Sequence, residues 1–151
     1  MRVVIQRVLK ASVTIDDTIH SEINKGLLVL LGIEKEDTLD DATWLALKLS
    51  AMRIFSDQDG KMNLSISEVE NGEFLVVSQF TLYASTKKGN RPSFIKSGHP
   101  DIAIPLYEYF CKKLKDVASV NVKTGVFAAD MKVSLINDGP VTIIMDSKTR
   151  E

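Results

Sequence analysis

The residues best suited to do chemistry stand at the end of an apolar run in the middle of the chain. The run 74–77 is followed directly by Ser78-Gln79-Phe80-Thr81-Leu82. Two hydroxyls and a carboxamide at the end of a buried strand need hydrogen-bond partners, because an unpaired buried polar group costs roughly 1–3 kcal/mol. Either the fold or a ligand must supply them. Thr81 could act as a nucleophile, or Ser78 and Thr81 could bond within the sheet; the residues alone leave both interpretations open.

The chain offers few of the other groups that catalysis uses. A nucleophile needs a nearby base, and the two histidines, His20 and His99, lie in no recognisable motif. His99 lies close to a basic segment, so contact with a ligand is an alternative to a plain loop position. The single cysteine, Cys111, is expected to be a small buried hydrophobe. Neither a metal site nor a glycine-rich phosphate loop is indicated, so we expect no metal and no cofactor.

What remains is a set of hydroxyl and backbone groups, and a second stretch adds to it. Asn137-Asp138-Gly139-Pro140-Val141-Thr142 lies near the C-terminus. Only ~5–6% of X-Pro bonds in folded proteins are cis, so the residues alone favour an ordinary turn before a last strand.

Composition limits the function classes. The 151 residues fit one domain, 1–151, and the hydrophobic fraction of 44% is typical of a folded globular protein. A net charge of -1 gives no overall attraction to nucleic acid or to an anionic membrane, so any nucleic-acid contact needs a local basic patch. The lone cysteine excludes an internal disulfide framework and favours the cytoplasm. No apolar run approaches the ~18 residues of a membrane span, so we expect no membrane partner.

A local basic patch lies in the segment 84–100, the longest stretch without helix or strand periodicity. Loops above ~12 residues in compact domains tend to be functional or mobile. The segment has no acidic residue and carries four cations: Lys87, Lys88, Arg91 and Lys96. A solvated surface loop and an anion-binding patch both fit this pattern.

Apolar patterns place these stretches on strands and helices. The runs 26–33 and 73–82 are apolar on both faces, which predicts paired central strands. Asp16-Asp17 is a turn signal between strands predicted at 3–15 and 18–23. A helix is predicted at 39–52, with Thr38 as its N-cap. Further strands are predicted at 120–124, 131–136 and 141–145, and the polar tail after Asp146 is expected to fray.

A second helix is predicted after the basic segment, and Pro105 fits only near its first turn. Its buried face should carry Leu106, Tyr109, Phe110 and Leu114. The expected fold is α/β: a single domain of mixed, barrel-like β-sheet with two main helices packed outside. Both halves share the order strand, loop, helix and further strands, which suggests an internal duplication.

The two polar stretches together resemble the D-aminoacyl-tRNA deacylase family. Collinear support comes from several further stretches: Gln6-Arg7-Val8, Ala11-Ser12-Val13, Gly26-Leu27-Leu28-Val29, Arg53-Ile54-Phe55, Lys61-Met62-Asn63-Leu64-Ser65, Gly89-Asn90-Arg91-Pro92-Ser93-Phe94 and Thr124-Gly125-Val126-Phe127. Small departures are Ala128, where we expect glycine, and Pro105 inside the second helix. They bear on local backbone detail and leave the resemblance intact.

The resemblance implies an enzyme that hydrolyses D-amino acids, and also glycine, from the 3′ end of tRNA. It implies a homodimer in which a cis Gly139-Pro140 peptide reaches the partner's site and rejects L-amino acids. The catalytic residues so implied are Ser78, Gln79, Phe80 and Thr81. The substrate-binding residues are Asn137, Gly139, Pro140 and Met131, and the candidate contacts to the acceptor stem of the tRNA are Lys87, Lys88 and Arg91.

The family interpretation also fits the missing triad. The ribose 2′-hydroxyl beside the ester can assist attack by water, so the protein need supply only positioning and oxyanion stabilisation. The backbone amides around Phe80 and Thr81 are the expected oxyanion donors. Ser78 and Gln79 would hold the strand end and the terminal adenosine. A non-catalytic RNA-binding module and a threonine-nucleophile hydrolase of another ester or amide are the alternatives.

Overall fold

Two strands that are buried on both faces form the centre of the fold. In the computed structural model, which describes residues 1–150, β3 (Gly26–Gly32) and β6 (Glu73–Ser78) pair in parallel. Both strands were predicted from their continuous apolar runs, and the structure confirms them as central. Each strand contributes side chains to two separate hydrophobic clusters, one on each face of the sheet, which explains why neither strand alternates.

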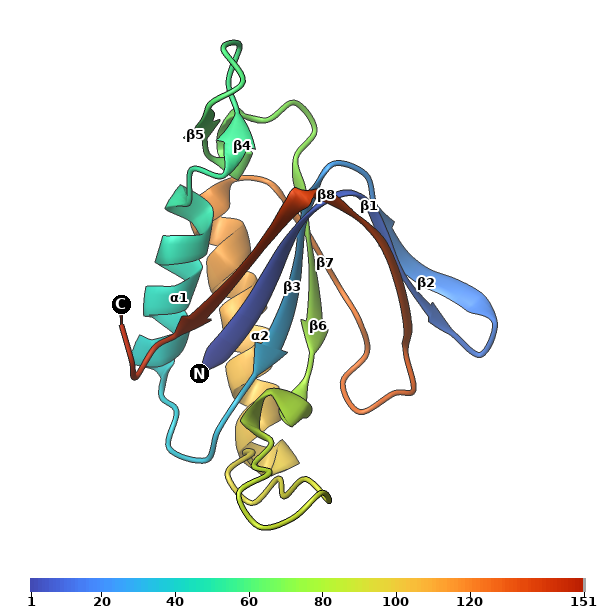
Figure 1. The fold of residues 1–151 in the computed structure, drawn as a ribbon, viewed down its shortest axis with the longest axis vertical. Helices are drawn as coiled ribbons and strands as arrows, with labels where there is room; N and C mark the ends of the chain where they lie inside the picture. The colour runs from blue at the N-terminus through green and yellow to red at the C-terminus, as the bar shows by residue number, and fades with distance from the viewer. Residues whose placement is uncertain (151) are drawn as a thin grey trace.

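The other strands extend the sheet on both sides (Figure 1). The order is β2-β1-β3-β6-β7, and β8 pairs with the free side of β1. These strands are β1 (Arg2–Ile15), β2 (Thr18–Ile23), β7 (Asn121–Thr124) and β8 (Lys132–Asp146). β1 is antiparallel to its three neighbours, whereas β6 and β7 are parallel, so the sheet is mixed.

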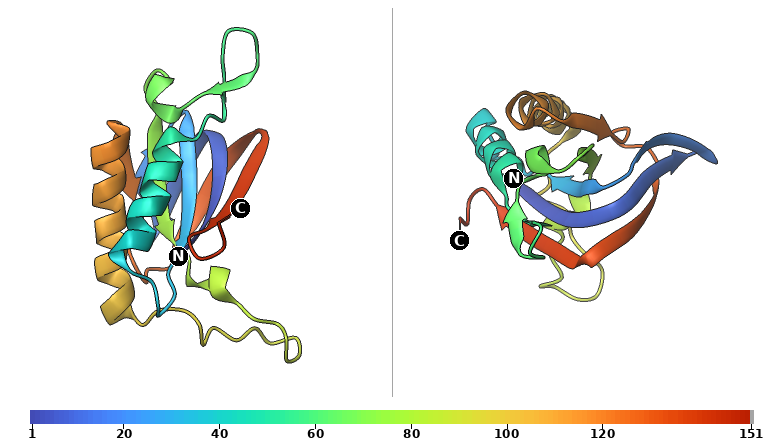
Figure 2. Two further views of the ribbon diagram at one scale, coloured as in Figure 1. Left: turned by 90° about the vertical axis from the view of Figure 1, so that its left-hand side faces the viewer. Right: turned by 90° about the horizontal axis from the view of Figure 1, so that it is seen from above.

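The sheet curls until its far strands meet (Figure 2). Ser21 Oγ on β2 donates to the Thr124 carbonyl at 2.9 Å, and Lys123 Nζ on β7 donates to the Glu22 carbonyl at 2.7 Å. Side-chain hydrogen bonds thus join β2 to β7 where a backbone ladder would close a barrel. The mixed, nearly closed barrel-like sheet with two helices agrees with the fold class predicted from the sequence.

β1 contributes side chains to both hydrophobic clusters, because the alternation of inward-facing and outward-facing side chains changes phase along the strand. Val3 and Ile5 face the cluster beneath the helices, whereas Val8, Ala11 and Val13 face the cluster inside the curled sheet. The register with β8 shifts on both sides of Val8. A bulge at this point turns the strand and flips which side chains face inward, so one strand lines two cores.

The two helices lie side by side on the outer face of the sheet (Figure 2). α1 (Leu39–Ala51) begins at Thr38, whose backbone amide donates to the Asp41 carboxylate at 2.9 Å, as predicted for an N-cap. α2 (Pro100–Ala118) begins with a proline at its first position. Pro105 therefore lies beyond the first turn, where we had not expected it.

The buried face of α2 differs from the predicted one at a single aromatic residue. Leu106, Phe110 and Leu114 are buried as predicted, but Tyr107 takes the buried position that we assigned to Tyr109. Tyr109 is half-buried, and its hydroxyl lies 3.0 Å from the Thr43 hydroxyl on α1. Both positions fall near the apolar stripe of the helix, so periodicity alone does not separate them.

The connections between these elements contain short pieces of structure. β4 (Phe55–Ser56) and β5 (Met62–Leu64) form a small separate hairpin that stands away from the barrel in Figure 1, and η1 (Ile66–Glu68) follows it. Along residues 1–150, no helix is both long and apolar enough to cross a membrane. The two strand-loop-helix units, β3 with α1 and β6 with α2, recur in order, while their common origin stays a prediction.

Two predicted boundaries were wrong. The strand predicted at 73–82 ends at Ser78, and the chain continues as a turn of 3₁₀ helix, η2 (Phe80–Tyr83). The strands predicted at 131–136 and 141–145 are one strand, β8, which runs past Gly139-Pro140. Both differences arise from hydrogen bonds to distant strands, which local sequence patterns do not encode.

The C-terminal tail is docked, so its predicted fraying was also wrong. Ser147 is buried, and Lys148 Nζ donates to Asp41 Oδ2 on α1 at 2.7 Å. The Arg150 guanidinium lies over the Trp44 ring, 4.6 Å from its centre. These contacts hold the tail against the N-terminal half of α1.

The tail contributes to a charge network at the start of α1. Burial tends to raise the pKa of Asp41, but hydrogen bonds from Lys148, Ser147 and Thr38 outweigh that effect and hold this pKa well below its usual range. A carboxyl with a lowered folded-state pKa stabilises the fold above its unfolded pKa of about 4, and this stabilisation is lost as pH falls through the folded value.

We predict that Lys148→Met lowers the free energy of unfolding at pH 7 by about 1 kcal/mol, because Lys148 is partly exposed and its ion pair is screened by solvent. The deficit should narrow as pH falls below about 4. Urea unfolding at pH 7 and at a pH below about 4 measures this difference in the free energy of unfolding between the variant and the wild type. Lys112→Met, which removes an exposed lysine of α2, is the control and should leave stability within about 0.5 kcal/mol. Equal losses in the two variants would contradict the docked tail.

Candidate active site

A cavity of about 690 Å³ opens at the carboxyl ends of the two parallel strands. The arrowheads of β3 and β6 mark these ends at the lower end of the sheet in Figure 1. Ligands of α/β sheets commonly bind at this edge, where parallel strands stop and their loops diverge. Three segments complete the walls: η2, the end of the basic loop with the start of α2, and the loop before β8. The lining residues that the argument uses are Ser78, Gln79, Phe80, Phe94, Phe127 and Met131.

The first polar stretch turns out of the sheet at this cavity. The backbone amide of Gln79 donates to the backbone carbonyl of Leu31 at 2.8 Å, and this bond connects the end of β6 to the end of β3. The Leu82 amide then bonds the Gln79 carbonyl at 3.2 Å and opens the 3₁₀ turn. In a 3₁₀ turn the first backbone amides have no acceptor within the turn. The amides of Phe80 and Thr81 precede the first hydrogen bond of this turn, so they have no acceptor within it.

The side chains of this stretch partly satisfy one another. Gln79 Nε2 donates to the Thr81 hydroxyl at 2.5 Å. Thr81 is exposed and does not line the cavity, whereas Ser78, Gln79 and Phe80 do. The fold therefore supplies a hydrogen-bond partner to Thr81, but this partner is a neighbouring side chain in the 3₁₀ turn and not a group of the sheet, as one interpretation of the sequence had it.

The basic loop is fastened to the same turn. The Phe94 ring packs edge-on against Phe80, with ring centres 5.0 Å apart. Ser97 Oγ donates to the Phe80 carbonyl at 3.0 Å. His99 lies on the rim, where its Nδ1 is 3.0 Å from Asp101 Oδ2 in an exposed contact.

The opposite wall comes from the loop before β8 and is braced from below. The Tyr107 hydroxyl donates to the Val76 carbonyl at 2.8 Å, and its ring packs edge-on against Phe127. Met131 also packs into the cluster inside the sheet. A Cβ at Gly125 would lie 2.5 Å from the Met131 sulfur, so a larger residue there would require the flexible Met131 side chain to shift.

The second polar stretch forms a bulge in β8 and lies outside this cavity. Gln6 pairs with Thr142 and Val8 pairs with Asn137, so the four residues 138–141 stand opposite Arg7 alone. The Asn137 amide closes the base of the bulge by donating to the carbonyls of Arg7 and Val141, at 3.0 and 3.1 Å. The Gly139-Pro140 peptide bond is cis, as the family resemblance implies, and both residues are exposed.

Arg7 fills the base of the bulge. Its guanidinium is buried, forms an ion pair with Asp138 at 2.9 Å and donates to the Ile54 carbonyl at 2.6 Å. A Cβ placed on Gly139, whose φ is 120°, would lie 3.0 Å from Arg7 Nη2 and 2.9 Å from a Val141 methyl group. Glycine is therefore required at this position both by its backbone and by its surroundings.

The structure thus brings together part of the predicted site. Ser78, Gln79, Phe80 and Met131 meet at one cavity; Thr81 lies just outside it. Asn137, Gly139 and Pro140 lie in the β8 bulge, and the exposed cations Lys87, Lys88 and Arg91 lie on the basic loop beyond the cavity. Phe94 and Phe127 were not assigned a role from the sequence. Their position in stretches that match the family was the available signal.

Other chemistry finds little support in the described part of the chain. Among residues 1–150, no three His, Cys, Asp or Glu side chains gather as a metal site would require. Burial raises the pKa of the Cys111 thiol to about 12, so it is not a thiolate at neutral pH.

Comparison with known proteins identifies the family of this chain. The sequence model of the D-Tyr-tRNA(Tyr) deacylase family matches residues 4–146. The chain belongs to this family. A relative from Flavobacterium johnsoniae named D-aminoacyl-tRNA deacylase is 58% identical, and one of the same name from Akkermansia muciniphila is 62% identical. In both comparisons the alignment covers 100% of this chain and 100% of the relative.

Solved structures share the fold. One, titled c-Myc DNA Unwinding Element Binding Protein, superimposes with a TM-score of 0.89 at 38% identity, covering 97% of this chain and 98% of that chain. A second, described as a probable eukaryotic D-amino acid tRNA deacylase, superimposes with a TM-score of 0.82 at 17% identity, covering 95% and 97%. At that identity the second shows the fold alone.

We predict that Arg7→Met lowers the free energy of unfolding by about 2–4 kcal/mol, because it leaves Asp138 and the Ile54 carbonyl without their buried partner. Chemical denaturation measures the change. Arg53→Met is the matched control: Arg53 is exposed and bonds Asn63 in the small hairpin, so its loss should cost no more than about 1 kcal/mol. Similar losses in both variants would show that the bulge does not depend on Arg7.

Proposed function

We propose that this family member hydrolyses the ester between a D-amino acid, or glycine, and the 3′-terminal adenosine of tRNA, and that it rejects L-aminoacyl-tRNA. The observation that carries the proposal is the meeting of Ser78, Gln79, Phe80 and Met131 at the cavity where the parallel strands end, in a chain that matches the deacylase family throughout. The enzyme would act in translation proofreading in the cytoplasm and would need no cofactor.

The chemistry rests on backbone groups and on the RNA itself. Water attacks the ester carbonyl, a new carbon–oxygen bond forms, the bond to the ribose oxygen breaks, and a proton passes to that oxygen. The adjacent 2′-hydroxyl assists the attack, and the amides of Phe80 and Thr81 stabilise the oxyanion. Ser78 and Gln79 hold the strand end and the terminal adenosine.

The decisive experiment compares D-tyrosyl-tRNA with L-tyrosyl-tRNA as substrates of the purified protein. Release of D-tyrosine with little release of L-tyrosine is the expected result. If neither amino acid is released, the protein is a binding module instead of an enzyme. Equal release of both amino acids would support hydrolase activity but would overturn the proposed rejection of L-aminoacyl-tRNA.

The substrate-binding role of Gly139, Pro140 and Asn137 requires a second subunit. The bulge lies outside its own cavity and is exposed, so in a dimer it is available to the partner's cavity. In a two-fold dimer each subunit gives its bulge to the other. Main-chain carbonyls at Gly139 and Pro140 would then meet an L side chain and leave a D side chain free, which is specificity by exclusion.

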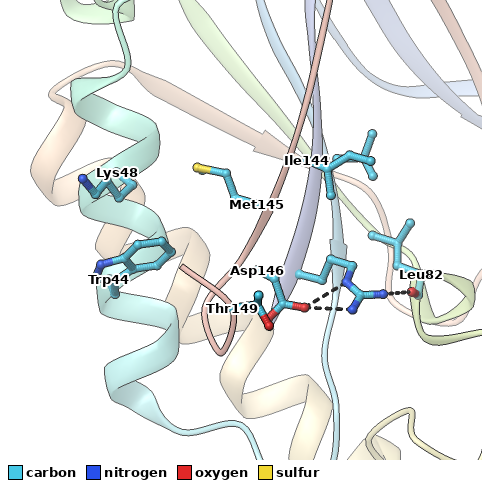
Figure 3. A pocket seen from close by; sticks show the side chains of 9 residues that line it. Trp44, Lys48, Leu82, Ile144, Met145, Asp146 and Thr149 are labelled. Carbon is cyan, nitrogen blue, oxygen red and sulfur yellow. Dashed lines mark hydrogen bonds and ion pairs between the residues drawn. The ribbon is translucent and has the colours of Figure 1, made fainter. Parts of the chain in front are cut away.

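A surface suitable for such a dimer, which carries both apolar and charged side chains, lies on the outer side of β1 and β8. A second cavity of about 590 Å³ opens there beside α1 (Figure 3). Its lining includes Val4, Leu82 and Ile144, and Ile144 is 69% exposed. Arg2 spans its edge, with bonds to Asp146 and to the Leu82 carbonyl, and so connects this surface to the first polar stretch.

We predict that Gly139→Ala abolishes deacylation and that activity returns in mixed dimers. The second variant, Met131→Arg, fills the cavity with a long charged side chain. If the bulge acts on the partner's cavity, a dimer of the two variants contains one intact site, and random mixing restores about a quarter of wild-type activity. Co-expression followed by the deacylation assay measures this. No recovery would show that bulge and cavity act within one subunit.

A control separates the effect of Gly139 from general strain. Gly60 also has a positive φ, 78°, and a Cβ there would meet no atom within 4 Å. Gly60→Ala should retain full activity despite a similar backbone cost of about 1 kcal/mol.

We predict that Thr81→Ala retains activity within about tenfold of wild type, because the backbone amide of residue 81 stays in place. Single-turnover deacylation of D-tyrosyl-tRNA measures it, with the exposed Thr18→Ala as the control. Complete loss of activity with intact folding and intact tRNA binding would instead favour Thr81 as the nucleophile.

The basic loop is proposed to bind the acceptor stem. Lys87, Lys88 and Arg91 are exposed, and no carboxylate interrupts the segment 84–100 in the sequence. Exposed cations of this kind contact phosphates and leave the base sequence unread.

A further inference from the structure

The end of the basic loop forms a fixed turn at the rim of the cavity. The Ser97 amide donates to the Phe94 carbonyl at 3.0 Å, which closes a β-turn with Ile95 and Lys96 at its two corners. Phe94 and Ser97, on either side of these corners, both line the cavity. The two corner residues do not line the cavity themselves, but they lie between two residues that do.

Contacts on both sides hold this turn in place. Before it, Ser93 and Ser85 exchange two backbone hydrogen bonds, at 2.8 and 2.9 Å. Within the turn, the Lys35 amide donates to the Lys96 carbonyl at 3.3 Å, and after it the Gly98 amide donates to the Ile33 carbonyl at 2.8 Å. Together with the contacts of Phe94 and Ser97 to Phe80, these bonds present the corners as a preformed surface.

Ile95 has no packing role within the described residues. It is 85% exposed, the largest exposed fraction among the large hydrophobic side chains of residues 1–150. A single exposed isoleucine is common on protein surfaces. This one lies in a hydrogen-bonded turn, next to the exposed Lys96 and directly after Phe94, which lines the cavity.

We propose that Ile95 and Lys96 bind the unpaired nucleotides that precede the terminal adenosine of the RNA substrate. Ile95 packs against a base face, and Lys96 pairs with the phosphate beside it. The proposal rests on the proposed function, because a terminal adenosine in the cavity forces the next nucleotides out across the rim. Single-stranded RNA alternates apolar base faces with phosphates, which matches a hydrophobic and a cationic side chain in adjacent positions.

Charge favours RNA over a protein partner on this surface. Lys96 belongs to the segment 84–100, which carries four cations and no carboxylate. The segment therefore attracts a phosphate backbone, and its other cations, Lys87, Lys88 and Arg91, are exposed as well.

The test compares a substrate that crosses the rim with one that does not. D-tyrosyl-tRNA contains the unpaired 3′ nucleotides, whereas the D-tyrosyl ester of adenosine ends inside the cavity. We expect Ile95→Ser to raise KM for D-tyrosyl-tRNA about fivefold, with kcat unchanged and hydrolysis of the adenosine ester unaffected. Lys96→Gln should lower the slope of log KM against log salt concentration by about 0.7, the value for one single-strand phosphate contact.

Ile19→Ser is the matched control, because Ile19 is 58% exposed on β2 and does not line the cavity. It should change neither substrate's kinetics. An unchanged KM for D-tyrosyl-tRNA in Ile95→Ser would overturn the inference, and so would an equal change on the adenosine ester. Failure of the wild-type protein to release D-tyrosine would overturn the proposed function, whereas an active wild type with a silent Ile95→Ser overturns only the rim contact.

Discussion

The parallel pairing of β3 with β6 is the constraint on which the rest of the structure depends. Because both strands run in one direction, Leu31 and Ser78 reach the same edge of the sheet in register. The bond from the Gln79 amide to the Leu31 carbonyl then fixes where the chain leaves the sheet, and the 3₁₀ turn, the rim and the cavity follow from that point. Antiparallel neighbours would have placed the ends of these strands at opposite edges.

The sequence located the elements whose patterns are local. The runs at 26–33 and 73–77 are apolar on both faces, and Thr38 with Asp41 marks the start of α1; each signal lies within a few residues of the structure it specifies. It missed features that depend on distant partners. η2 requires an acceptor on β3, the continuity of β8 requires Arg7, and the tail requires Asp41 and Trp44 on α1.

The candidate site likewise has parts that the sequence predicts and parts that depend on contacts between distant segments. Residue types marked the two polar stretches, and the family resemblance gave them roles. Neither showed that Thr81 would accept a bond from Gln79, or that Phe94 would pack on Phe80 across a loop without periodicity. Aromatic contacts between separate segments leave no spacing signal in a single chain, so geometry is needed to find them.

The bulge in β8 has a consequence for how this protein can change over time. The four residues opposite Arg7 leave the ladder and return to it beside the same neighbour, so the pairing of β1 with β8 is fixed independently on either side. Substitutions at the tip of the bulge therefore leave the register of the barrel unaltered. Apart from Gly139, whose φ and surroundings require glycine, residues of the bulge can therefore change while the pairing of the barrel is kept.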